Sequence, residues 1–237
     1  MSRDTGRSGV LHGMPTQPLT ADELERLRRY DAPTVANAIE TFDVRPRTAG
    51  YASPAVRCIF PQLEVMVGYA VTARARANTP SDGSYSRHGW WDAIAAAPGP
   101  RVAVIQDLDD PPVGAFWGEV QANIHRALGC VGAITNGGVR DLREVEPLGF
   151  HYFAGSVMVS HAYVHMIDFG TPVSIGGLEI KPGDLIHADR HGVQVIPPEI
   201  ARAIPDACEK IAAHERTIIS LCQSPDFTLD ALKRIQP

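Results

Sequence analysis

The hydrophobic and polar positions near the start of the chain repeat with the spacing of two helices. Thr20 is followed three residues later by Glu23, a capping-box pattern that predicts the start of the first helix. A second helix is expected after Pro33, because residues 34–42 place four apolar side chains on one face: Val35, Ala38, Ile39 and Phe42. Residues 1–18 precede both helices, and their polar, Gly-rich composition predicts a flexible arm.

Further along, the apolar positions form continuous runs that are typical of buried strands. Residues 63–75 are dense in Val, Thr and Tyr and predict one strand, and residues 102–107 and 131–135 predict two more. Between the last two runs, residues 118–128 (GEVQANIHRAL) have the pattern of a helix. Strand, helix and strand at this spacing predict a βαβ unit with parallel strands and a right-handed crossover.

The last third of the chain has a different pattern. Residues 172–197 alternate short β runs with Gly-Gly, Pro-Gly-Asp and Arg-His-Gly turns, which is typical of antiparallel hairpins. A closing amphipathic helix is expected to start near Pro198 and to run past Ile218. The expected fold is therefore α/β: a βαβ core and an antiparallel β-hairpin section in a single domain, residues 19–237, with a C-terminal helix.

Composition and charge exclude several classes of protein. Of the 237 residues, 44% are hydrophobic and 21% charged, as in an ordinary globular protein. The formal net charge is −5 and no Lys/Arg run is present, so no nucleic-acid partner is expected. No apolar run approaches the ~18 residues of a membrane span and no secretory signal opens the chain, which favours a cytoplasmic protein without a membrane partner. The four cysteines form no CxxC pair and are expected to be buried and reduced: Cys58, Cys130, Cys208 and Cys222.

Residues that suit catalysis follow directly on the strand predicted at 131–135. Ligands of open α/β sheets bind beyond the carboxyl ends of parallel strands, and Gly137 and Gly138 leave room there for close approach to the backbone. Arg140 suits a planar carboxylate, and Asp141 offers hard oxygen ligands to Mg²⁺ or Mn²⁺. The alternative is that Asp141 caps the following helix while Arg140 forms a surface ion pair.

The start of the predicted crossover helix supplies a second element. Gly118 opens it, and the unpaired N–H groups of Glu119, Val120 and Gln121 form an anion-binding helix N-terminus. The carboxylate of Glu119 offers a further oxygen ligand, or alternatively only complements the helix dipole. Both elements follow strand ends and are expected to meet at the same sheet edge, which indicates a site for a metal and a 2-oxo acid.

Two segments, residues 114–144 and 171–197, resemble the RraA-like family, and the similarity extends over roughly residues 31–215. The string Arg-Asp-x-x-Glu at 140–144, with Gly-Glu upstream, carries the resemblance in the site, and PGD…ADxxGV supports the fold. That family includes 4-hydroxy-4-methyl-2-oxoglutarate/4-carboxy-4-hydroxy-2-oxoadipate aldolases, oxaloacetate decarboxylases and non-enzymatic regulators of ribonuclease activity. The resemblance implies a swivelling β/β/α-type core.

Position by position, the resemblance implies the roles of the site residues. Asp141 becomes a ligand of Mg²⁺ or Mn²⁺, with Glu119 as a further acidic group of the metal shell, acting through water. Arg140 becomes the residue that binds the pyruvyl group and stabilises the enolate. The amides of Val120 and Gln121 become donors to the substrate carboxylate.

The resemblance also implies an oligomer, a trimer often stacked into a hexamer. The aldolases draw a Glu from the C-terminal helix of a neighbouring subunit, and Glu215 is the best match here, with Glu209 as the alternative. Residues 78–94 are longer and more aromatic than the family pattern, and residues 161–168 replace a commonly Arg- and Ser-containing stretch. These departures leave the substrate open.

Two pairs of histidines are spaced four residues apart: His161 with His165, and His187 with His191. Neither pair encloses the Glu of an HExxH zinc helix, so structural or surface roles are expected. His161 and His165 remain candidates for the substrate pocket.

The function that these residues indicate is a metal-dependent lyase acting on a small 2-oxo acid. It would perform a class II retro-aldol cleavage of a 4-hydroxy-2-oxo acid that releases pyruvate, or decarboxylate oxaloacetate, through a pyruvate enolate. The alternative is a non-catalytic, protein-binding regulator of the ribonuclease-regulator type, which the set of Arg140, Asp141 and Glu119 argues against. No GxGxxG or P-loop motif is present to support nucleotide chemistry or a methyltransferase.

Overall fold

The computed structural model describes residues 17–81, 83 and 87–236. Its helices are α1 (Ala21–Arg28), α2 (Ala32–Glu40), α3 (Arg87–Ala96), α4 (Glu119–Ala127), α5 (Leu142–Val145), α6 (Ile204–Gln223) and α7 (Leu229–Ile235), with a 3-10 turn at Glu146–Leu148. Its strands are β1 (Arg57–Cys58), β2 (Met66–Arg76), β3 (Arg101–Asp107), β4 (Ala115–Trp117), β5 (Cys130–Thr135), β6 (Gly138–Val139), β7 (His151–Ala154), β8 (Ser156–Val157), β9 (His165–Phe169), β10 (Val173–Ile175), β11 (Leu178–Ile180), β12 (Leu185–Asp189) and β13 (Gly192–Ile196).

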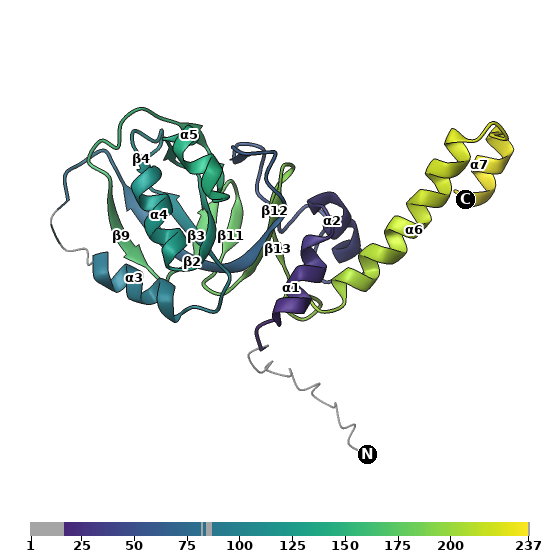
Figure 1. Cartoon of the computed structure of the whole chain (residues 1–237), viewed down its shortest axis with the longest axis horizontal. Coiled ribbons are helices and arrows are strands. Elements are labelled where there is room, and N and C mark those ends of the chain that lie inside the picture. Colours follow the sequence, from purple (N-terminus) through teal and green to yellow (C-terminus); the bar gives the residue numbers. More distant parts are fainter. Residues whose placement is uncertain (1–16, 82, 84–86, 237) are drawn as a thin grey trace, which may run out of the picture.

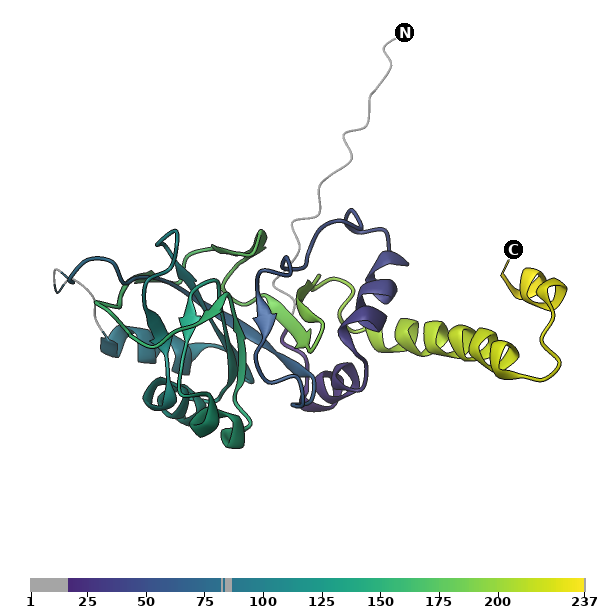
Figure 2. The same cartoon turned by 90° about the horizontal axis from the view of Figure 1, so that it is seen from above.

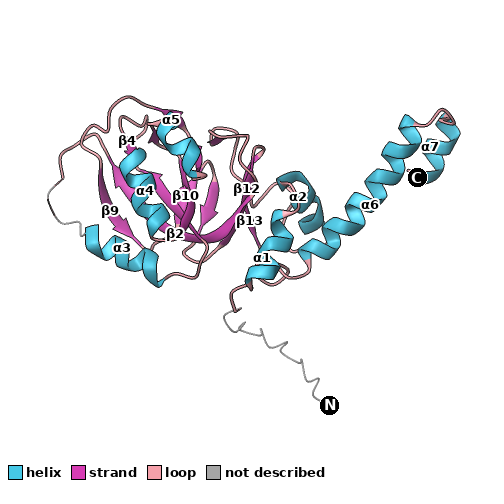
Figure 3. Ribbon diagram, viewed as in Figure 1, coloured by secondary structure: helices cyan, strands magenta, loops and turns pink. Residues whose placement is uncertain are grey.

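A mixed eight-stranded sheet forms the centre of the molecule, with the order β1-β7-β5-β3-β2-β12-β13 and β9 paired to β2 (Figure 3). Strands β2, β3, β5 and β7 are parallel, and the other pairs are antiparallel. Because β3 and β5 are parallel neighbours joined by α4, the predicted βαβ unit is confirmed. The predicted hairpins are also confirmed, as β10-β11 and β12-β13.

Three apolar clusters pack around this sheet. Helices α3 and α4 cover one face, where Trp90 and Ala122 lie buried with the strand residue Ile105 (Figure 1). The β10-β11 hairpin covers the other face with a cluster that includes Ile175. A third cluster joins α1, α2 and the first turns of α6 to the β12-β13 hairpin, and its members include Val35.

A second, smaller sheet lies beyond the carboxyl ends of the central strands. Strands β4, β6 and β8 pair side by side in parallel, and each follows β3, β5 or β7 along the chain. The sequence did not predict these strands, since two or three residues are too few to show a period. This small sheet positions the candidate site.

The C-terminal helices extend from the side of the molecule where α1 and α2 pack (Figure 1). Helix α6 projects away from the sheet, and α7 folds back beside its far end (Figures 1 and 2). The predicted helix start near Pro198 is wrong: residues 197–203 make successive turns, with Ala203 N donating to Ile200 O, before α6 begins at Ile204. A helix that began near Pro198 would need the N–H of residue 205 to donate to Ala201 O, and Pro205 has none; it lies instead in the first turn of α6, where no N–H is needed.

Two further predictions concern the N-terminal segment and the cysteines. Residues 1–16 of the predicted arm lie outside the described residues, and the carbonyls of Gln17 and Pro18 accept hydrogen bonds from the guanidinium of Arg202. All four cysteines are free thiols, and the expected burial is confirmed for Cys130 and Cys208. It is wrong for Cys58, which is half-buried, and for Cys222, which is exposed on the projecting part of α6.

Candidate functional site

The small parallel sheet brings the predicted site residues to one edge. Gly118 follows β4, and Arg140 and Asp141 follow β6. The backbone N–H of Arg140 donates to the carbonyl of Trp117 at 3.0 Å, which fixes the end of β6 against the end of β4. The expectation that both segments end at the same edge of the sheet is therefore confirmed.

Asp141 is held in an uncommon backbone conformation and reaches across to another helix. Its φ of 57° and ψ of 44° lie in the left-handed region, which non-glycine residues adopt rarely and mostly at constrained sites. Asp141 occupies the N-cap position of α5, but its side chain makes no capping bond there. Its Oδ2 instead accepts a hydrogen bond from the backbone N–H of Glu119 at 2.9 Å, so it serves the first turn of α4. The alternative in which this side chain caps the helix that follows it is wrong.

Gly118 makes this approach possible. A Cβ atom at this position would lie 2.5 Å from Asp141 Oδ2 and 3.2 Å from Arg140 Nε. Both distances are shorter than ordinary contacts, so any side chain at residue 118 would displace the carboxylate or the guanidinium. Gly118 is thus required for the packing of the site, whereas its predicted contact with substrate stays a prediction.

Arg140 lies beside Asp141 and is only loosely held. Its Nε is 3.8 Å from Asp141 Oδ2, and its Nη1 donates a long hydrogen bond of 3.4 Å to the carbonyl of Val159. The side chain is 36% exposed, so most of its five N–H donors remain available to an added carboxylate or keto oxygen.

The N-terminus of α4 faces the same edge. Its first intrahelical bond runs from Ala122 N to Gly118 O at 2.9 Å, so the amides of Val120 and Gln121 precede the hydrogen-bonded ladder. Asp141 already accepts from the Glu119 amide, which leaves those two amides as the donors open to a ligand. The two open amides at the start of α4 have the arrangement expected of an anion-binding helix N-terminus, and anion binding there stays a prediction.

Buried polar contacts anchor α4 on the core. His125 accepts a hydrogen bond at Nε2 from Trp90 Nε1 at 2.9 Å, so its Nδ1–H donates to the carbonyl of Gln121 at 2.7 Å. Burial lowers the pKa of His125 to about 4, and the ring is therefore neutral at pH 7. The hydroxyl of Tyr152 donates to Gly118 O at 3.2 Å, and burial, with a smaller contribution from Asp141, raises the pKa of this phenol.

The donor atoms at the edge are suited to a hard divalent cation. Asp141 Oδ2 is engaged by Glu119, whereas Oδ1 accepts no hydrogen bond from any described residue, and the Glu119 side chain is exposed. No group of three or more His, Cys, Asp or Glu side chains able to hold a metal gathers within the described part of the chain. Mg²⁺ commonly binds through one or two carboxylates and keeps several waters, so these residues fit Mg²⁺ better than a zinc-type cage.

Glu215 does not join this group within one chain. It is exposed on α6, in the helix that projects away from the sheet (Figure 1). A role for Glu215 therefore requires a second copy of the chain, as predicted, and remains a prediction.

Gly137 and Gly138 have a different role from the one expected. A Cβ at Gly137 would lie 2.6 Å from Asp107 Oδ2, and one at Gly138 would lie 2.5 Å from Met158 Sδ. Each glycine makes room for a protein side chain, so the expectation that they admit a ligand is wrong.

Sequence reasoning passed over the polar residues that tie the strand ends together. The side chain of Asn136, after β5, accepts from Asp107 N and donates to Asp107 O, both at 2.8 Å. The buried carboxylate of Asp109 accepts from the amides of Ala77 and Asn78. The signal available in the sequence was the run of Asp residues directly after the apolar strand 102–107.

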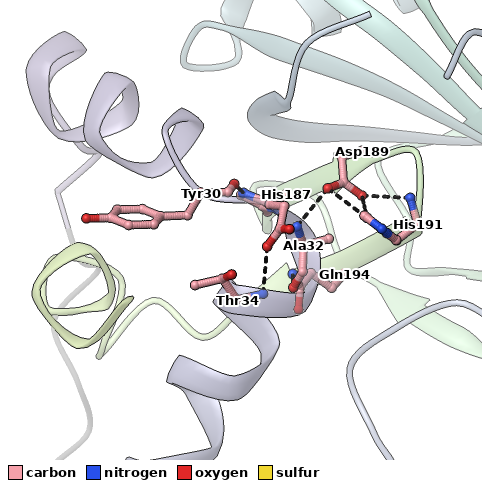
Figure 4. A network of polar contacts seen from close by, with 8 residues as sticks. Tyr30, Ala32, Thr34, His187, Asp189, His191 and Gln194 are labelled. Carbon is pink, nitrogen blue, oxygen red and sulfur yellow. Dashed lines mark hydrogen bonds and ion pairs between the residues drawn. The ribbon is translucent and has the colours of Figure 1, made fainter. Parts of the chain in front are cut away.

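The histidine pairs form no metal centre in the described residues. His187 is fully buried and its Nε2 contacts the carbonyl of Tyr30, while His191 contacts the carboxylate of Asp189 (Figure 4). His161 and His165 are bonded through Nδ1 to nearby backbone carbonyls. The structural role expected for the second pair is confirmed.

Comparison with known proteins agrees with this architecture. Solved structures with the same fold include an uncharacterized protein from Pseudomonas syringae pv. tomato (22% identity, 95% of this chain and 99% of the other, TM-score 0.74). They also include an unusual member of the RNase ES inhibitor RraA protein family from Streptomyces coelicolor (20% identity, 86% of this chain and 98% of the other, TM-score 0.69). At these identities the likeness shows the fold alone.

The sequence comparisons define the family. A family model described as RraA-like, Aldolase/RraA, matches residues 32–195, and the chain therefore belongs to the RraA-like family. A relative from Halalkalibacterium halodurans, provisionally named 4-hydroxy-4-methyl-2-oxoglutarate aldolase, is 32% identical over 99 residues, or 41% of this chain and 47% of the relative. An uncharacterized protein from Methanocaldococcus jannaschii is 29% identical over 105 residues, or 44% of this chain and 50% of the relative. The chain spans about half the length of these curated relatives.

The family includes both aldolases and regulators of ribonucleases, so membership alone does not assign an activity. Among the described residues, no helix has the length and apolar character needed to cross a membrane.

Proposed function

We propose that this chain is a lyase that depends on a divalent metal and cleaves a carbon–carbon bond in a small 2-oxo acid. The observation that carries the proposal is the convergence of Arg140, Asp141 and the N-terminus of α4 around Gly118. A carboxylate with a free oxygen, a guanidinium with free donors and two open amides are what a 2-oxo acid and a divalent cation require. The reaction is a class II retro-aldol cleavage that releases pyruvate, decarboxylation of oxaloacetate, or both.

The residues of this chain would bind and orient the substrate. The amides of Val120 and Gln121 donate to its carboxylate, because they are the helix donors left open. The guanidinium of Arg140 donates to the 2-keto oxygen, whose negative charge grows as the enolate forms. An interaction that strengthens along the reaction lowers the barrier rather than only tightening binding.

Asp141 and Glu119 complete the proposed machinery. Asp141 Oδ1 is the atom available to hold Mg²⁺ or Mn²⁺, because Oδ2 is engaged by the Glu119 amide. A cation bound there would act as a Lewis acid toward the keto and carboxylate oxygens of the substrate. The exposed carboxylate of Glu119 would hold and move a proton, directly or through water.

We further propose that the active unit is a homotrimer or a hexamer. The projecting α6–α7 segment carries exposed apolar side chains, including Ile219, Phe227 and Leu229, which favours a partner for it. A neighbouring copy would place Glu215 at the edge that holds Asp141, supplying a second carboxylate to the metal. Light scattering at micromolar concentration tests the assembly, and a particle of only 25.6 kDa would exclude it.

One observation favours the alternative, a protein-binding regulator without catalysis. The described residues of one chain supply fewer than three metal-ligating side chains to this edge. A regulator would need neither the metal nor the free donors of Arg140, so the two functions differ in what they demand of these residues.

A coupled assay for pyruvate distinguishes the two functions. Purified protein would be assayed on a panel of 4-hydroxy-2-oxo acids and on oxaloacetate, after EDTA treatment and with Mg²⁺ or Mn²⁺ restored. Turnover that requires the metal supports the lyase. Turnover at full rate in metal-free protein would contradict the role of Asp141, and no turnover on any substrate with any metal would favour the regulator.

Arg140→Ala tests the enolate role, with Arg190→Ala in the exposed turn between β12 and β13 as the matched control. Loss of charge-assisted hydrogen bonds that stabilise the transition state costs roughly 2–4 kcal/mol, or about 30- to 1000-fold in kcat. Arg140→Lys keeps the charge but loses the planar fork, so its kcat should fall between those of wild type and Arg140→Ala. If only KM rises and kcat is unchanged, Arg140 binds substrate and transition state equally and has no enolate role.

A further inference from the structure

A cavity of about 390 Å³ lies at the opposite edge of the central sheet from the candidate site. It is lined by the first residues of β2, β5 and β7, by the last turn of α4 and by the end of α1. Because β2, β3, β5 and β7 run parallel, their starting ends are remote from the edge that carries Arg140. Helix α4 spans the distance, with the candidate site at its N-terminus and Arg126 at its C-terminal end.

The charges that line this cavity are positive. Arg126 and Arg28 both line it, and no Asp or Glu does among the described residues. The guanidinium of Arg126 makes no hydrogen bond or ion pair with any residue that the structure describes. Arg28 uses Nη1 on Glu25 at 3.2 Å and Nη2 on the carbonyl of Val67 at 3.3 Å, which holds its side chain at the cavity and leaves other N–H groups unused.

The other titratable groups of the cavity are uncharged at neutral pH. Burial lowers the pKa of His151 to about 4 and raises that of the Cys130 thiol to about 12. The two arginines are therefore the only charged side chains among the described residues that line it.

Arg126 is also not required as a cap for α4. The carbonyl of Leu128, after the end of that helix, accepts a hydrogen bond from Arg101 Nη1 at 2.9 Å. Arg101 is held in turn by the carbonyl of Ala97, which accepts from its Nε at 2.8 Å. Because Arg101 already compensates the negative end of the helix dipole, the charge of Arg126 remains available to a ligand.

We propose that this cavity binds a small dicarboxylate. Two arginines from segments far apart in sequence offer separate donors for two carboxylates, and each guanidinium can bind one of them bidentately. Val65, Val131 and Phe150 also line the cavity and offer apolar surface that suits a short hydrocarbon spacer. A volume of about 390 Å³ exceeds that of a single inorganic anion and equals on the order of ten water molecules.

Isothermal titration calorimetry of the full chain with succinate tests the proposal. We expect one succinate per chain to bind in this cavity of the wild type, and Arg140→Gln should retain that binding because it alters only the candidate site at the other edge. Arg126→Gln should weaken binding at least tenfold, Arg126→Lys should weaken it less, and Arg216→Gln on exposed α6 should leave it unchanged. Unchanged thermal unfolding of Arg126→Gln, which alters an exposed residue, would show that the variant is folded.

Several outcomes would overturn the proposal. They are loss of succinate binding in Arg140→Gln with retention in Arg126→Gln, or no heat of binding up to about 10 mM succinate. Equal affinity for butyrate, which has one carboxylate, would remove the need for two cationic groups. Binding of inorganic phosphate but not of succinate would assign the cavity to a different anion.

Discussion

Two aspartates in this molecule each accept a hydrogen bond from the first backbone amide of a helix that is distant in sequence. They differ in how many of their remaining carboxylate oxygens are hydrogen-bonded. Asp189 Oδ2 accepts from the first amide of α2, that of Ala32, at 2.8 Å, and Asp141 Oδ2 accepts from the first amide of α4, that of Glu119, at 2.9 Å. Asp189 is 5% exposed, and its Oδ1 accepts from the backbone N–H of His191 at 2.7 Å (Figure 4). The side chain of Asp141 is 37% exposed and its Oδ1 accepts from no described residue.

The comparison separates a structural carboxylate from a candidate functional one. Both carboxylate oxygens of Asp189 accept backbone hydrogen bonds. Gln194 adds a further bond at the start of α2 by donating to the carbonyl of Ala32. At Asp141 half of the acceptor capacity is unused beside a loosely held Arg140, and the backbone is in the left-handed region. Buried polar groups that are fully paired stabilise a fold, whereas unused acceptors in a constrained position suit a ligand.

The largest expected effect is on activity in Asp141→Asn. Asparagine keeps an oxygen that can accept from the Glu119 amide, so α4 should remain capped, but the negative charge for the metal is lost. We expect kcat/KM for the active substrate to fall about 100- to 1000-fold, with thermal unfolding close to that of wild type. Steady-state kinetics with saturating Mg²⁺ and a thermal melt on the same preparation measure both. A variant that retains activity would place the metal elsewhere or remove it from the reaction.

The matched change at the other site, Asp189→Asn, should have the reverse effect. Both oxygens of Asp189 accept N–H bonds, so the amide nitrogen of Asn must face a donor and leave it unpaired. An unpaired buried donor costs about 1–3 kcal/mol, which lowers Tm by about 2–12 °C in a chain of this size. Urea unfolding and activity at 25 °C check this, and a loss of activity without a loss of stability would contradict the structural role.

Part of the fold could be predicted from the sequence because its signals are local. The capping box at Thr20 and Glu23 is a local signal, and both of its hydrogen bonds are present in the structure. The helix α4 and the strands β3 and β5 were likewise predictable, since each is long enough for its apolar pattern to be recognised.

The contacts that define the candidate site are different in kind. The bond from Glu119 N to Asp141 joins residues 22 positions apart and depends on the left-handed backbone of Asp141. Strands β4, β6 and β8 are too short to have a period, and they are the elements that bring those two residues together. The prediction that Gly137 leaves room for a ligand was wrong for a similar reason. The side chain that occupies this space belongs to Asp107, which is 30 positions earlier and approaches Gly137 only in the folded chain.

The pH dependence of stability gives a smaller effect that is confined to the Asp189 side. Burial lowers the pKa of His187 below its ordinary value of 6.5, outweighing the opposite effects of Asp189 and Asp31. The folded state therefore favours the neutral ring, so this stability is complete above pH 6.5 and is lost as the pH falls toward the folded pKa. We therefore expect His187 to make the free energy of unfolding lower at pH 5.5 than at pH 7.5.

Urea unfolding of wild type and His187→Gln at the two pH values measures this contribution. His125 and His151, whose pKa values burial lowers to about 4, act with the same sign in both proteins and cancel in the difference. Equal losses of stability in the two proteins would show that His187 takes up no proton on unfolding in this pH range.

The smallest effect is expected from Tyr152→Phe, which tests whether the structural support under Asp141 is separable from its chemistry. The buried hydroxyl donates to Gly118 O at 3.2 Å, and the same carbonyl accepts from Ala122 N at 2.9 Å. Because the carbonyl keeps one partner, removing the hydroxyl should cost only about 0.5–1 kcal/mol of stability. The backbone of Gly118 and the carboxylate of Asp141 should not move, so kcat should fall by less than about threefold. If kcat instead fell more than about tenfold at unchanged stability, the Tyr152 hydroxyl would take part in the reaction itself. Its role as a structural support beneath Asp141 would then be contradicted.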